Sequence, residues 1–194
     1  NPASLPLLVD FDLYHLHPFQ TDAGLGSLEQ FFGGQIPADQ KHSRSPYLDR
    51  YLAATLAFGH AACLPDIGVW GLAAALKTYF LIQPLQGYYL GAQVESIHYH
   101  HNGNFLELTE ALISGAHEHS QLRITYRTGF QLYVNGGWQQ LWTIQHADQS
   151  FSLPPASFLA CSPQGVLAYS AEAGSGRIDY YQGPDYLYVD TRGT

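Results

Sequence analysis

Methionine is absent from this sequence of 194 residues, and charged residues are scarce. Lys, Arg, Asp and Glu make up 12% of the chain, against about 25% in a typical soluble domain. Only eight residues are Lys or Arg, and the formal net charge is −8. Because nucleic acids and anionic membrane surfaces both attract clustered cations, the composition argues against either as a partner. A chain with so few charges is expected to bury much of its surface, against itself or against a partner.

Several short signals are missing as well. Cys63 and Cys161 are too few for a disulfide framework. Their apolar neighbours favour buried free thiols, although a bond between them stays open. No glycosylation acceptor, no signal-peptide pattern and no apolar run of about 20 residues is present, so no spanning helix is expected. The chain begins with Asn, which suggests a fragment or a processed chain whose leader would lie upstream, so cytoplasmic and secreted locations both stay open.

The first part of the chain, residues 1–92, reads as one strand followed by helices. The apolar run of residues 5–9 ends in acids, which is typical of a strand buried on both faces. A long loop rich in Gly, Pro, Asp and Ser follows, with a short helix expected at 27–32. Two largely apolar helices are then expected, which begin at Ser45 and Asp66 because both residues are good N-caps.

From residue 93 onward the hydrophobic pattern has a period of two, in short runs separated by turn residues. The pairs Asn135–Gly136 and Asn102–Gly103 are strong signals for tight hairpins. Eight or more short strands at this spacing predict an antiparallel sandwich or barrel-like sheet. The expected fold class is therefore α+β, with an N-terminal strand and helices over 1–92 and an antiparallel β-sandwich over 93–194.

Two carboxylates and two imidazoles follow the first predicted strand: Asp10, Asp12, His15 and His17. Residues two apart on a strand face the same way, so the two carboxyl groups are expected roughly 6–7 Å apart. Glycosidases hold their paired carboxylates at about 5–9.5 Å. A role in a substrate cleft and a role in capping or loop anchoring both stay open.

Histidines also gather at residues 98–101 and 117–119, and metal binding is an alternative for them. Imidazole and carboxylate groups suit zinc or manganese. However, no Cys-x-x-Cys or His-Glu-x-x-His frame accompanies them, and no phosphate-binding glycine loop is present. Histidines that form hydrogen bonds at a cleft or strand edge are the preferred interpretation, so no metal and no cofactor is predicted.

The first apolar helix contains three further candidates. A buried imidazole needs a hydrogen-bond partner, so His60 is either a satisfied core residue or a group that positions substrate. Asp49 and Arg50, at the start of this helix, are candidates for a buried ion pair or for holding the long loop in place.

In their order along the chain, these segments resemble the C-terminal portion of a barrel-type glycoside hydrolase. The family has the architecture of endo-α-N-acetylgalactosaminidases and α-galactosidase-like enzymes, in which a catalytic (β/α)8 barrel ends in a last strand and helix and an antiparallel β-sandwich follows. The resembling segments are LLVDFDLYHLHP, LDRYLAATLAFGHAACL, YFLIQPLQGYYL, ITYRTGFQLYVNGGWQQLWTI, LPPASFLACS and YLYVDTRG.

The resemblance implies that Asp10, Asp12, His15 and His17 lie at the C-terminal mouth of a late barrel strand, where barrel enzymes place their chemistry. A complete barrel takes about 250 residues, and only one strand–helix unit fits this chain. The catalytic residues are therefore unknown, and the missing N-terminal barrel portion is an expected partner. The predicted function is the C-terminal portion of a carbohydrate-active hydrolase, in which these four residues and His60 contact the carbohydrate substrate.

Two other functions stay open. The chain is alternatively a non-catalytic β-sandwich accessory or carbohydrate-binding module. Such a module would bind sugar without turnover through exposed aromatic rings such as Trp138 and Trp142. The weaker alternative is a metal-dependent enzyme built on the histidine clusters, which would contain bound zinc.

Overall fold

The computed structural model describes residues 28–174 and 176–193. The helical segments are α2 (Leu28–Phe31), η1 (Ala38–Gln40), α3 (Pro46–Ala57), α4 (Ile67–Trp70), α5 (Leu72–Lys77), η2 (Thr78–Ile82), α6 (Gln83–Tyr89), α7 (Leu108–Ser114) and η3 (Ala116–His119). The strands are β1 (Val94–His101), β2 (Asn104–Leu106), β3 (Gln121–Tyr126), β4 (Gln131–Asn135), β5 (Trp142–His146), β6 (Gln149–Leu153), β7 (Ser157–Cys161), β8 (Leu167–Ala173), β9 (Gly176–Gln182) and β10 (Leu187–Asp190). Helices followed by a large antiparallel sheet confirm the predicted α+β class.

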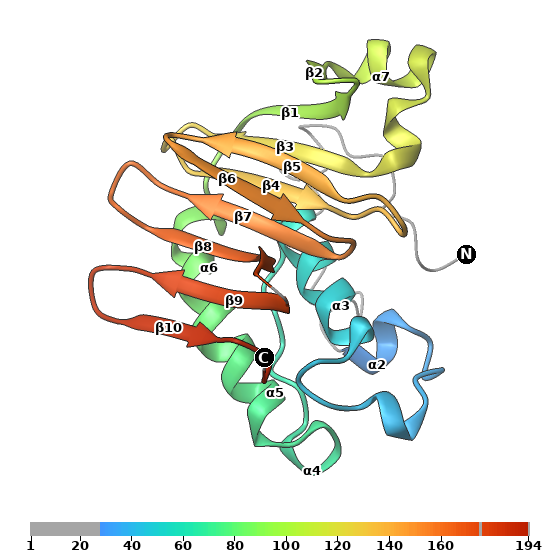
Figure 1. Ribbon diagram of the computed structural model, residues 1–194, viewed down its shortest axis with the longest axis vertical. Helices are drawn as coiled ribbons and strands as arrows, with labels where there is room; N and C mark the ends of the chain where they lie inside the picture. Colours follow the sequence, from blue (N-terminus) through green and yellow to red (C-terminus); the bar gives the residue numbers. More distant parts are fainter. Residues whose placement is uncertain (1–27, 175, 194) are drawn as a thin grey trace.

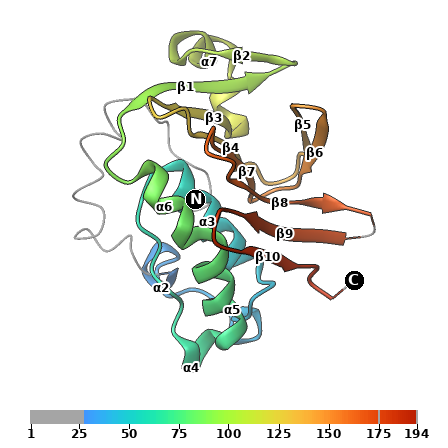
Figure 2. The same ribbon diagram turned by 90° about the vertical axis from the view of Figure 1, so that its left-hand side faces the viewer.

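The strands form one antiparallel sheet in the order β10-β9-β8-β7-β4-β3-β1-β2 (Figure 1). The hairpin of β5 and β6 leaves this path, and β6 pairs with β8. Figure 2 shows the sheet edge-on, with α3, α5 and α6 along one face and the β5–β6 hairpin turned away from them. The hairpin therefore adds a short second layer to the sheet.

Two hydrophobic cores lie on opposite faces of the sheet. Leu132 and Val134 of β4 pack in the main core with α3 and α6, whereas Tyr133 between them joins a smaller core under the β5–β6 hairpin. This alternation is the period of two expected for a strand. The main core joins residues from both sides of position 92, and the division into domains at that position stays a prediction.

Two helix starts confirm the predictions from sequence. The Ser45 side chain accepts a hydrogen bond from the backbone N–H of Tyr47 at the start of α3. The Asp66 carboxylate accepts one from the N–H of Gly68 at the start of α4. The second helix is interrupted after one turn, because Gly71 adopts a φ of 79° that separates α4 from α5.

Two predictions for the second half are wrong. Only strands were expected from residue 93 onward, but after the three residues of β2 the chain forms the helix α7. Leu108 and Ala111 have helical spacing, and Ala111 is fully buried. Asn135–Gly136 does not close a hairpin, because β4 pairs with β7 and β3 rather than β5. The Asn135 side chain is buried and donates to the carbonyls of Gln140 and Leu153. Asn102–Gly103 does turn β1 into β2, as predicted.

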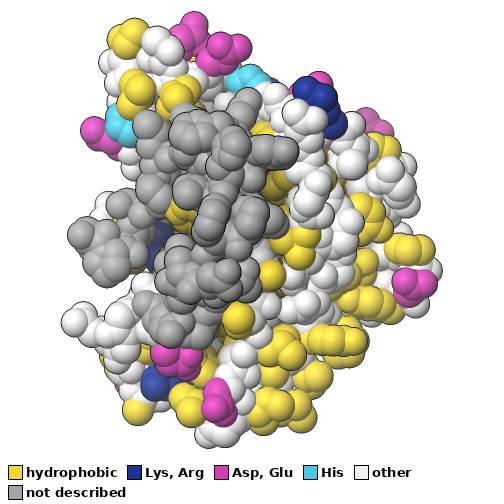
Figure 3. Space-filling view, turned by 180° about the vertical axis from the view of Figure 1, so that it is seen from behind, with side chains coloured by type: hydrophobic (Ala, Val, Ile, Leu, Met, Phe, Trp, Pro, Cys, Tyr) yellow, Lys and Arg dark blue, Asp and Glu magenta, His cyan; other side chains and the backbone are white. Residues whose placement is uncertain are grey.

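Large hydrophobic side chains remain exposed on the helical layer and on the edge strand β10. Figure 3 shows hydrophobic atoms gathered over the lower part of the back face, with few charged groups among them. The most exposed of these side chains include Ile67, Leu72, Tyr79, Leu187 and Val189. In the described part of the chain, no helix combines the length and the apolar character needed to cross a bilayer.

Candidate functional site

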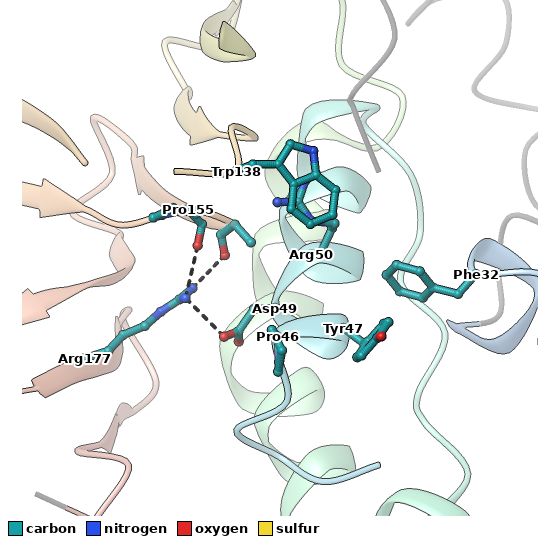
Figure 4. A pocket seen from close by; sticks show the side chains of 9 residues that line it. Phe32, Pro46, Tyr47, Asp49, Arg50, Trp138, Pro155 and Arg177 are labelled. Carbon is teal, nitrogen blue, oxygen red and sulfur yellow. Dashed lines mark hydrogen bonds and ion pairs between the residues drawn. The ribbon is translucent and has the colours of Figure 1, made fainter. Parts of the chain in front are cut away.

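A pocket of about 300 Å³ lies between the start of α3 and the loops at one end of the sheet. Figure 4 shows aromatic side chains on the helical side and an arginine that reaches in from the sheet. The described residues that line the pocket are Phe32, Pro46, Tyr47, Asp49, Arg50, Trp138, Pro155, Ala156 and Arg177. The pocket thus combines apolar walls with two guanidinium groups and one carboxylate, and its volume is at the lower end of that of small-molecule sites.

The start of α3 places Asp49 and Arg50 on different sides of the helix. Successive residues of an α-helix are rotated by about 100°, so the two side chains diverge although they are neighbours in sequence. Asp49 points toward β9 and Arg50 toward the loop after β4 (Figure 4). Asp49 is therefore part of a buried ion pair, as predicted, but its partners come from distant parts of the chain and not from the neighbouring Arg50.

The Asp49 carboxylate is surrounded by three cations. Its Oδ1 atom lies 2.6 Å from Lys77 Nζ. Its Oδ2 atom lies 2.7 Å from Arg192 Nη1 and 3.1 Å from Arg177 Nη1. The side chain of Asp49 is 4% exposed and that of Lys77 is 1% exposed, so these interactions occur almost entirely out of water.

A second carboxylate, Asp179 of β9, shares these cations. Its side chain is fully buried and contacts Lys77 Nζ at 2.9 Å and Arg192 Nη2 at 2.8 Å. The Ser170 hydroxyl of β8 also donates to Asp179. The ion cluster, defined as Asp49, Lys77, Arg177, Asp179 and Arg192, therefore ties α3 and α5 to β9 and to the turn after β10.

The ion cluster keeps both acids ionised. Burial alone would raise the pKa of Asp49, but Lys77, Arg177 and Arg192 outweigh it and hold that pKa below 3.8, its ordinary value. Burial opposes ionisation of Asp179 in the same way, and Lys77 and Arg192 lower its pKa strongly. A carboxylate with a lowered pKa cannot serve as a general acid near neutral pH.

Arg177 connects the ion cluster to the pocket. Its Nε donates to Ser170 Oγ at 2.8 Å, and its Nη2 donates to the Ala156 carbonyl at 2.7 Å. Its Nη1 donates to the Pro155 carbonyl at 3.4 Å and lies beside Asp49 (Figure 4). The side chain is 17% exposed, so one edge of the guanidinium meets the pocket. Burial lowers the pKa of Arg177 despite its acidic neighbours.

Arg50 and Trp138 form the opposite wall. The Arg50 guanidinium carbon lies 3.6 Å from the centroid of the Trp138 ring, a cation–π contact. Its two terminal nitrogens donate to the carbonyls of Gly136 and Gly137, each at 3.0 Å. Burial lowers the pKa of Arg50 to about 10. Trp138 itself is 53% exposed, so a rigid arginine supports an accessible indole ring.

Phe32 and Tyr47 close the helical side of the pocket. Their rings meet edge to face, with 5.1 Å between centroids. Pairs of this geometry are favoured by the aromatic quadrupole. The pocket therefore presents aromatic groups from two directions, the loop after β4 and the start of α3.

Of the residues predicted from sequence to contact substrate, only His60 lies in the part of the chain that the structure describes. Asp10, Asp12, His15 and His17 lie outside the described residues, so their roles stay predictions. His60 follows α3 and is 7% exposed, with its ring centroid 5.1 Å from that of Phe58. Its carbonyl accepts a hydrogen bond from the Tyr89 hydroxyl. His60 does not line the pocket at Asp49, and a role in substrate binding stays a prediction.

The histidine clusters do not assemble a metal site in the described part of the chain. No group of three or more His, Cys, Asp or Glu side chains is placed there to hold an ion. His100 instead hydrogen-bonds to Gln121 at 2.9 Å, and the rings of His101 and His119 stack. His100 thus forms a hydrogen bond, as the preferred interpretation expects, but β1 lies between β2 and β3, so this histidine is not at an edge of the sheet.

The hydrophobic pattern of the sequence did not predict most of the ion cluster, although two features of the sequence pointed to it. Lys77 is the only charged residue between Asp66 and the end of α6, so a lysine in so apolar a helix requires a buried partner. Asp179 alternates with apolar residues on a strand and occupies an inward position. Of the two rings predicted to be exposed, Trp138 is 53% exposed, whereas Trp142 is only 3% exposed and packs in the smaller core.

A second pocket lies at the other end of the β5–β6 hairpin, where Cys161 Sγ is 3.9 Å from His146 Nδ1. Both cysteines are free thiols. Cys161 is buried, as predicted, whereas Cys63 is exposed, so the prediction of a buried thiol is wrong for Cys63. Burial raises the pKa of Cys161 to about 11, so its thiol is protonated at neutral pH and is a poor nucleophile.

This difference predicts selective alkylation. Iodoacetamide is expected to modify Cys63 in the folded protein at least about tenfold faster than Cys161, because only the thiolate reacts. Peptide mass spectrometry over a time course measures both rates. In guanidinium chloride the two rates should converge, and equal rates in the folded protein would contradict the burial of Cys161.

The chain was compared with known protein families, with curated protein sequences and with solved structures, and none of them matches.

Proposed function

We propose that the protein binds a carbohydrate in the pocket between α3 and the loops of the sheet, without cleaving it. The observation that carries this proposal is the half-exposed Trp138, which Arg50 holds at the wall of a pocket that also contains a partly exposed arginine. This conclusion corresponds to a carbohydrate-binding or accessory module rather than to a complete enzyme.

The chemistry of the pocket suits a sugar ring. A pyranose has a face of C–H groups that packs on aromatic rings and a rim of hydroxyls that needs hydrogen-bond partners. Trp138 and Tyr47 supply aromatic surface, and Arg177 supplies a donor at the floor. Indole and phenol side chains lose little conformational freedom when they bind, which favours them as contact residues.

The charges of the pocket argue against hydrolysis at this position. Glycoside hydrolysis needs a carboxylic acid with a raised pKa opposite a second carboxylate. Asp49 is the only carboxylate among the described residues that line the pocket, and its pKa is lowered. Its oxygens already contact three cations, which keep the carboxylate ionised. Asp49 therefore has no proton to donate to a leaving group.

The resemblance to a glycoside hydrolase stays a prediction and makes a separate test. Its candidate cleft residues are Asp10, Asp12, His15 and His17, which lie outside the described residues. A screen of the full-length protein against aryl glycosides, with Asp10→Asn and Asp12→Asn compared, tests it. Full activity in both variants would contradict a catalytic or substrate-binding role for the two acids.

The binding proposal predicts that Trp138→Ala weakens sugar binding by about tenfold or more, since one aromatic ring contributes about 1–3 kcal/mol where nucleobases stack on it. Saturation-transfer NMR with a panel of monosaccharides and oligosaccharides measures the affinity. Tyr79→Ala is the matched control, because Tyr79 is also 53% exposed and does not line the pocket. Equal loss in both variants, or no binding of any sugar to the unchanged protein, would contradict the proposal.

A further inference from the structure

We infer that the protein forms a symmetric dimer in which strand β10 of one copy pairs with β10 of a second copy. β10 is the last strand of the sheet, and in the described part of the chain it pairs only with β9. Figure 1 shows it at the end of the sheet opposite to β2 and α7. The outer edge of such a strand presents backbone N–H and C=O groups, which form a template for a further strand.

Side chains alternate between the two faces of β10. On one face, the Tyr186 hydroxyl donates to the carbonyl of Phe80 at 2.9 Å, and the rings of Tyr188 and Phe80 stack with 5.9 Å between centroids. Leu187 and Val189 point to the opposite face, and they are 61% and 48% exposed. Natural edge strands often carry Lys or Pro, which oppose pairing, and β10 contains neither.

Exposed hydrophobic surface continues from β10 onto the helical layer. Leu72, Leu76 and Tyr79 follow one another at intervals of four and three residues, so they share one face of α5 and η2. They are 57%, 41% and 53% exposed. The ring of Tyr79 lies 5.0 Å from that of Phe80, which packs against β10. We call Leu72, Leu76, Tyr79, Leu187 and Val189 the edge surface.

The charge of this surface favours a second copy over a partner of opposite charge. Each copy has a formal net charge of −8, so two copies can approach closely only where acids are few. The edge surface contains no charged side chain, and the one acid of β10, Asp190, accepts a hydrogen bond from the N–H of Arg192. A basic partner therefore has little to bind here, whereas a contact around a two-fold axis buries the same apolar surface twice.

The alternation of side chains fixes the register of the pairing. Residues directly opposite one another in antiparallel strands point to the same face, so the two-fold axis must pass through a residue of β10. With the axis at Tyr188, Leu187 of each copy lies opposite Val189 of the other. Asp190 then lies opposite Tyr186, and the two Asp190 residues are offset by roughly 13 Å along the strands. Apolar side chains thus meet, and the acids stay apart.

The size of the contact sets the expected affinity. β10 has four residues, whereas a standard interface contains about 20–30 residues and buries about 800 Å² on each partner. The exposed face of α5 and η2 extends the contact on the helical side of the sheet. Even with this extension the interface is smaller than the standard size, so we expect a dissociation constant in the micromolar range.

The molar mass in solution tests the dimer directly. Sedimentation equilibrium of the unchanged protein is expected to show a molar mass that rises from 21.5 kDa toward twice that value between about 1 and 100 µM. Added sodium chloride should strengthen the dimer, because salt screens the repulsion between two copies of the same charge. A monomer at every concentration overturns the inference. A dimer that salt dissociates also overturns it, since such a dimer would depend on ion pairs.

Val189→Lys is expected to raise the dissociation constant at least about tenfold, because a charge on an edge strand opposes pairing and enters each dimer twice. Ile113→Lys is the matched control: Ile113 is 83% exposed on α7, next to β2 at the opposite end of the sheet. Its expected effect is below about twofold. Equal effects in the two variants overturn the inference. Neither residue lines the pocket at Asp49, so these results do not decide the proposal of carbohydrate binding.

Disulfide cross-linking tests the register. In a Cys63→Ser background, copies with Leu187→Cys are mixed with copies with Val189→Cys. Opposite residues of antiparallel strands have Cα atoms about 4.5–5.5 Å apart, a distance that a disulfide spans. Two copies of the same variant are offset by two residues, which places these Cα atoms roughly 8 Å apart, too far for a disulfide.

The mixture is therefore expected to form mainly the mixed disulfide dimer, which mass spectrometry identifies. Equal cross-linking in the mixture and in each variant alone overturns the proposed pairing. Thermal unfolding shows whether Val189→Lys is folded. If it is not, the cross-linking and the molar mass of the unchanged protein decide the inference.

Discussion

Replacing Asp49 with asparagine is expected to lower the free energy of unfolding by about 3–5 kcal/mol, the range measured when one partner of a buried ion pair is removed. Among the described residues, Lys77, which is 1% exposed, would keep only Asp179 as an acidic partner, while Arg177 and Arg192 would both lose a carboxylate. Within the ion cluster, Asp179 alone would then face three cations whose side chains are at most 17% exposed. Urea denaturation followed by circular dichroism measures the change.

Asp39→Asn is the matched control for this prediction, because Asp39 lies exposed in η1 and forms no ion pair with the other residues that the structure describes. Its expected effect is within about 0.5 kcal/mol. A second comparison uses Lys77→Met together with Asp49→Asn. The double variant should lose less stability than the two single changes added together, since each single change leaves an unmatched charge. A loss below about 1 kcal/mol for Asp49→Asn would show that the ion cluster is not a determinant of stability.

The ion cluster brings together several of the few charged residues of this chain. Asp49 and Arg192 are separated by 143 positions in sequence, yet they join the first long helix to the end of the chain. Arg192 adopts a φ of 55°, in the left-handed region that side chains other than glycine rarely occupy. Its bonds to both carboxylates offset that local cost. The same cluster fixes the positions of Asp49 and Arg177 at the floor of the pocket.

Local signals predicted much of the fold because they act between neighbours. The N-caps Ser45 and Asp66 marked real helix starts, since a capping side chain bonds to an N–H two residues away. The alternating run of residues 94–101 matches β1. These features depend on residues within one or two turns, and a sequence displays them directly.

Long-range features could not be predicted in the same way. Asn135–Gly136 has the sequence of a tight hairpin, but Asn135 is held by Gln140 and Leu153, and the Gly136 N–H donates to Ser120. Tertiary contacts thus override the turn preference. The pairing of Asp49 with Arg192 depends on the packing of distant elements. The sequence around either residue does not indicate which residue is its partner.

The pocket was only partly visible in the sequence for the same reason. Trp138 was predicted to be an exposed ring. Arg177 and Asp49 contribute to the pocket only because the fold places their side chains next to one another. Their elements, α3 and β9, are brought together by the hydrophobic core. A sequence pattern identifies residue types suited to a site, and the fold decides which of them meet.

Acid is expected to destabilise the protein through the same two carboxylates. In the folded protein, the pKa values of Asp49 and Asp179 are below 3.8. This is the ordinary pKa of an aspartate, and we take it as the pKa of both residues in the unfolded chain. Below about pH 5 the unfolded chain begins to take up protons at these acids while the folded protein does not. The stabilisation that they contribute is therefore complete above about pH 5 and is lost progressively as the pH falls toward the lowered pKa values.

The contribution of Asp49 is isolated by the difference in unfolding free energy between the unchanged protein and Asp49→Asn. This difference should be constant between about pH 7 and pH 5 and should shrink steadily toward about pH 3, because asparagine has no proton to gain. Taking the difference removes the effect of histidines, which titrate in both proteins. Urea denaturation at each pH provides the values, with Asp39→Asn as the variant whose difference stays small throughout. A difference for Asp49→Asn that is unchanged at about pH 3 would mean that the three cations do not hold Asp49 in its ionised form in preference to the unfolded chain.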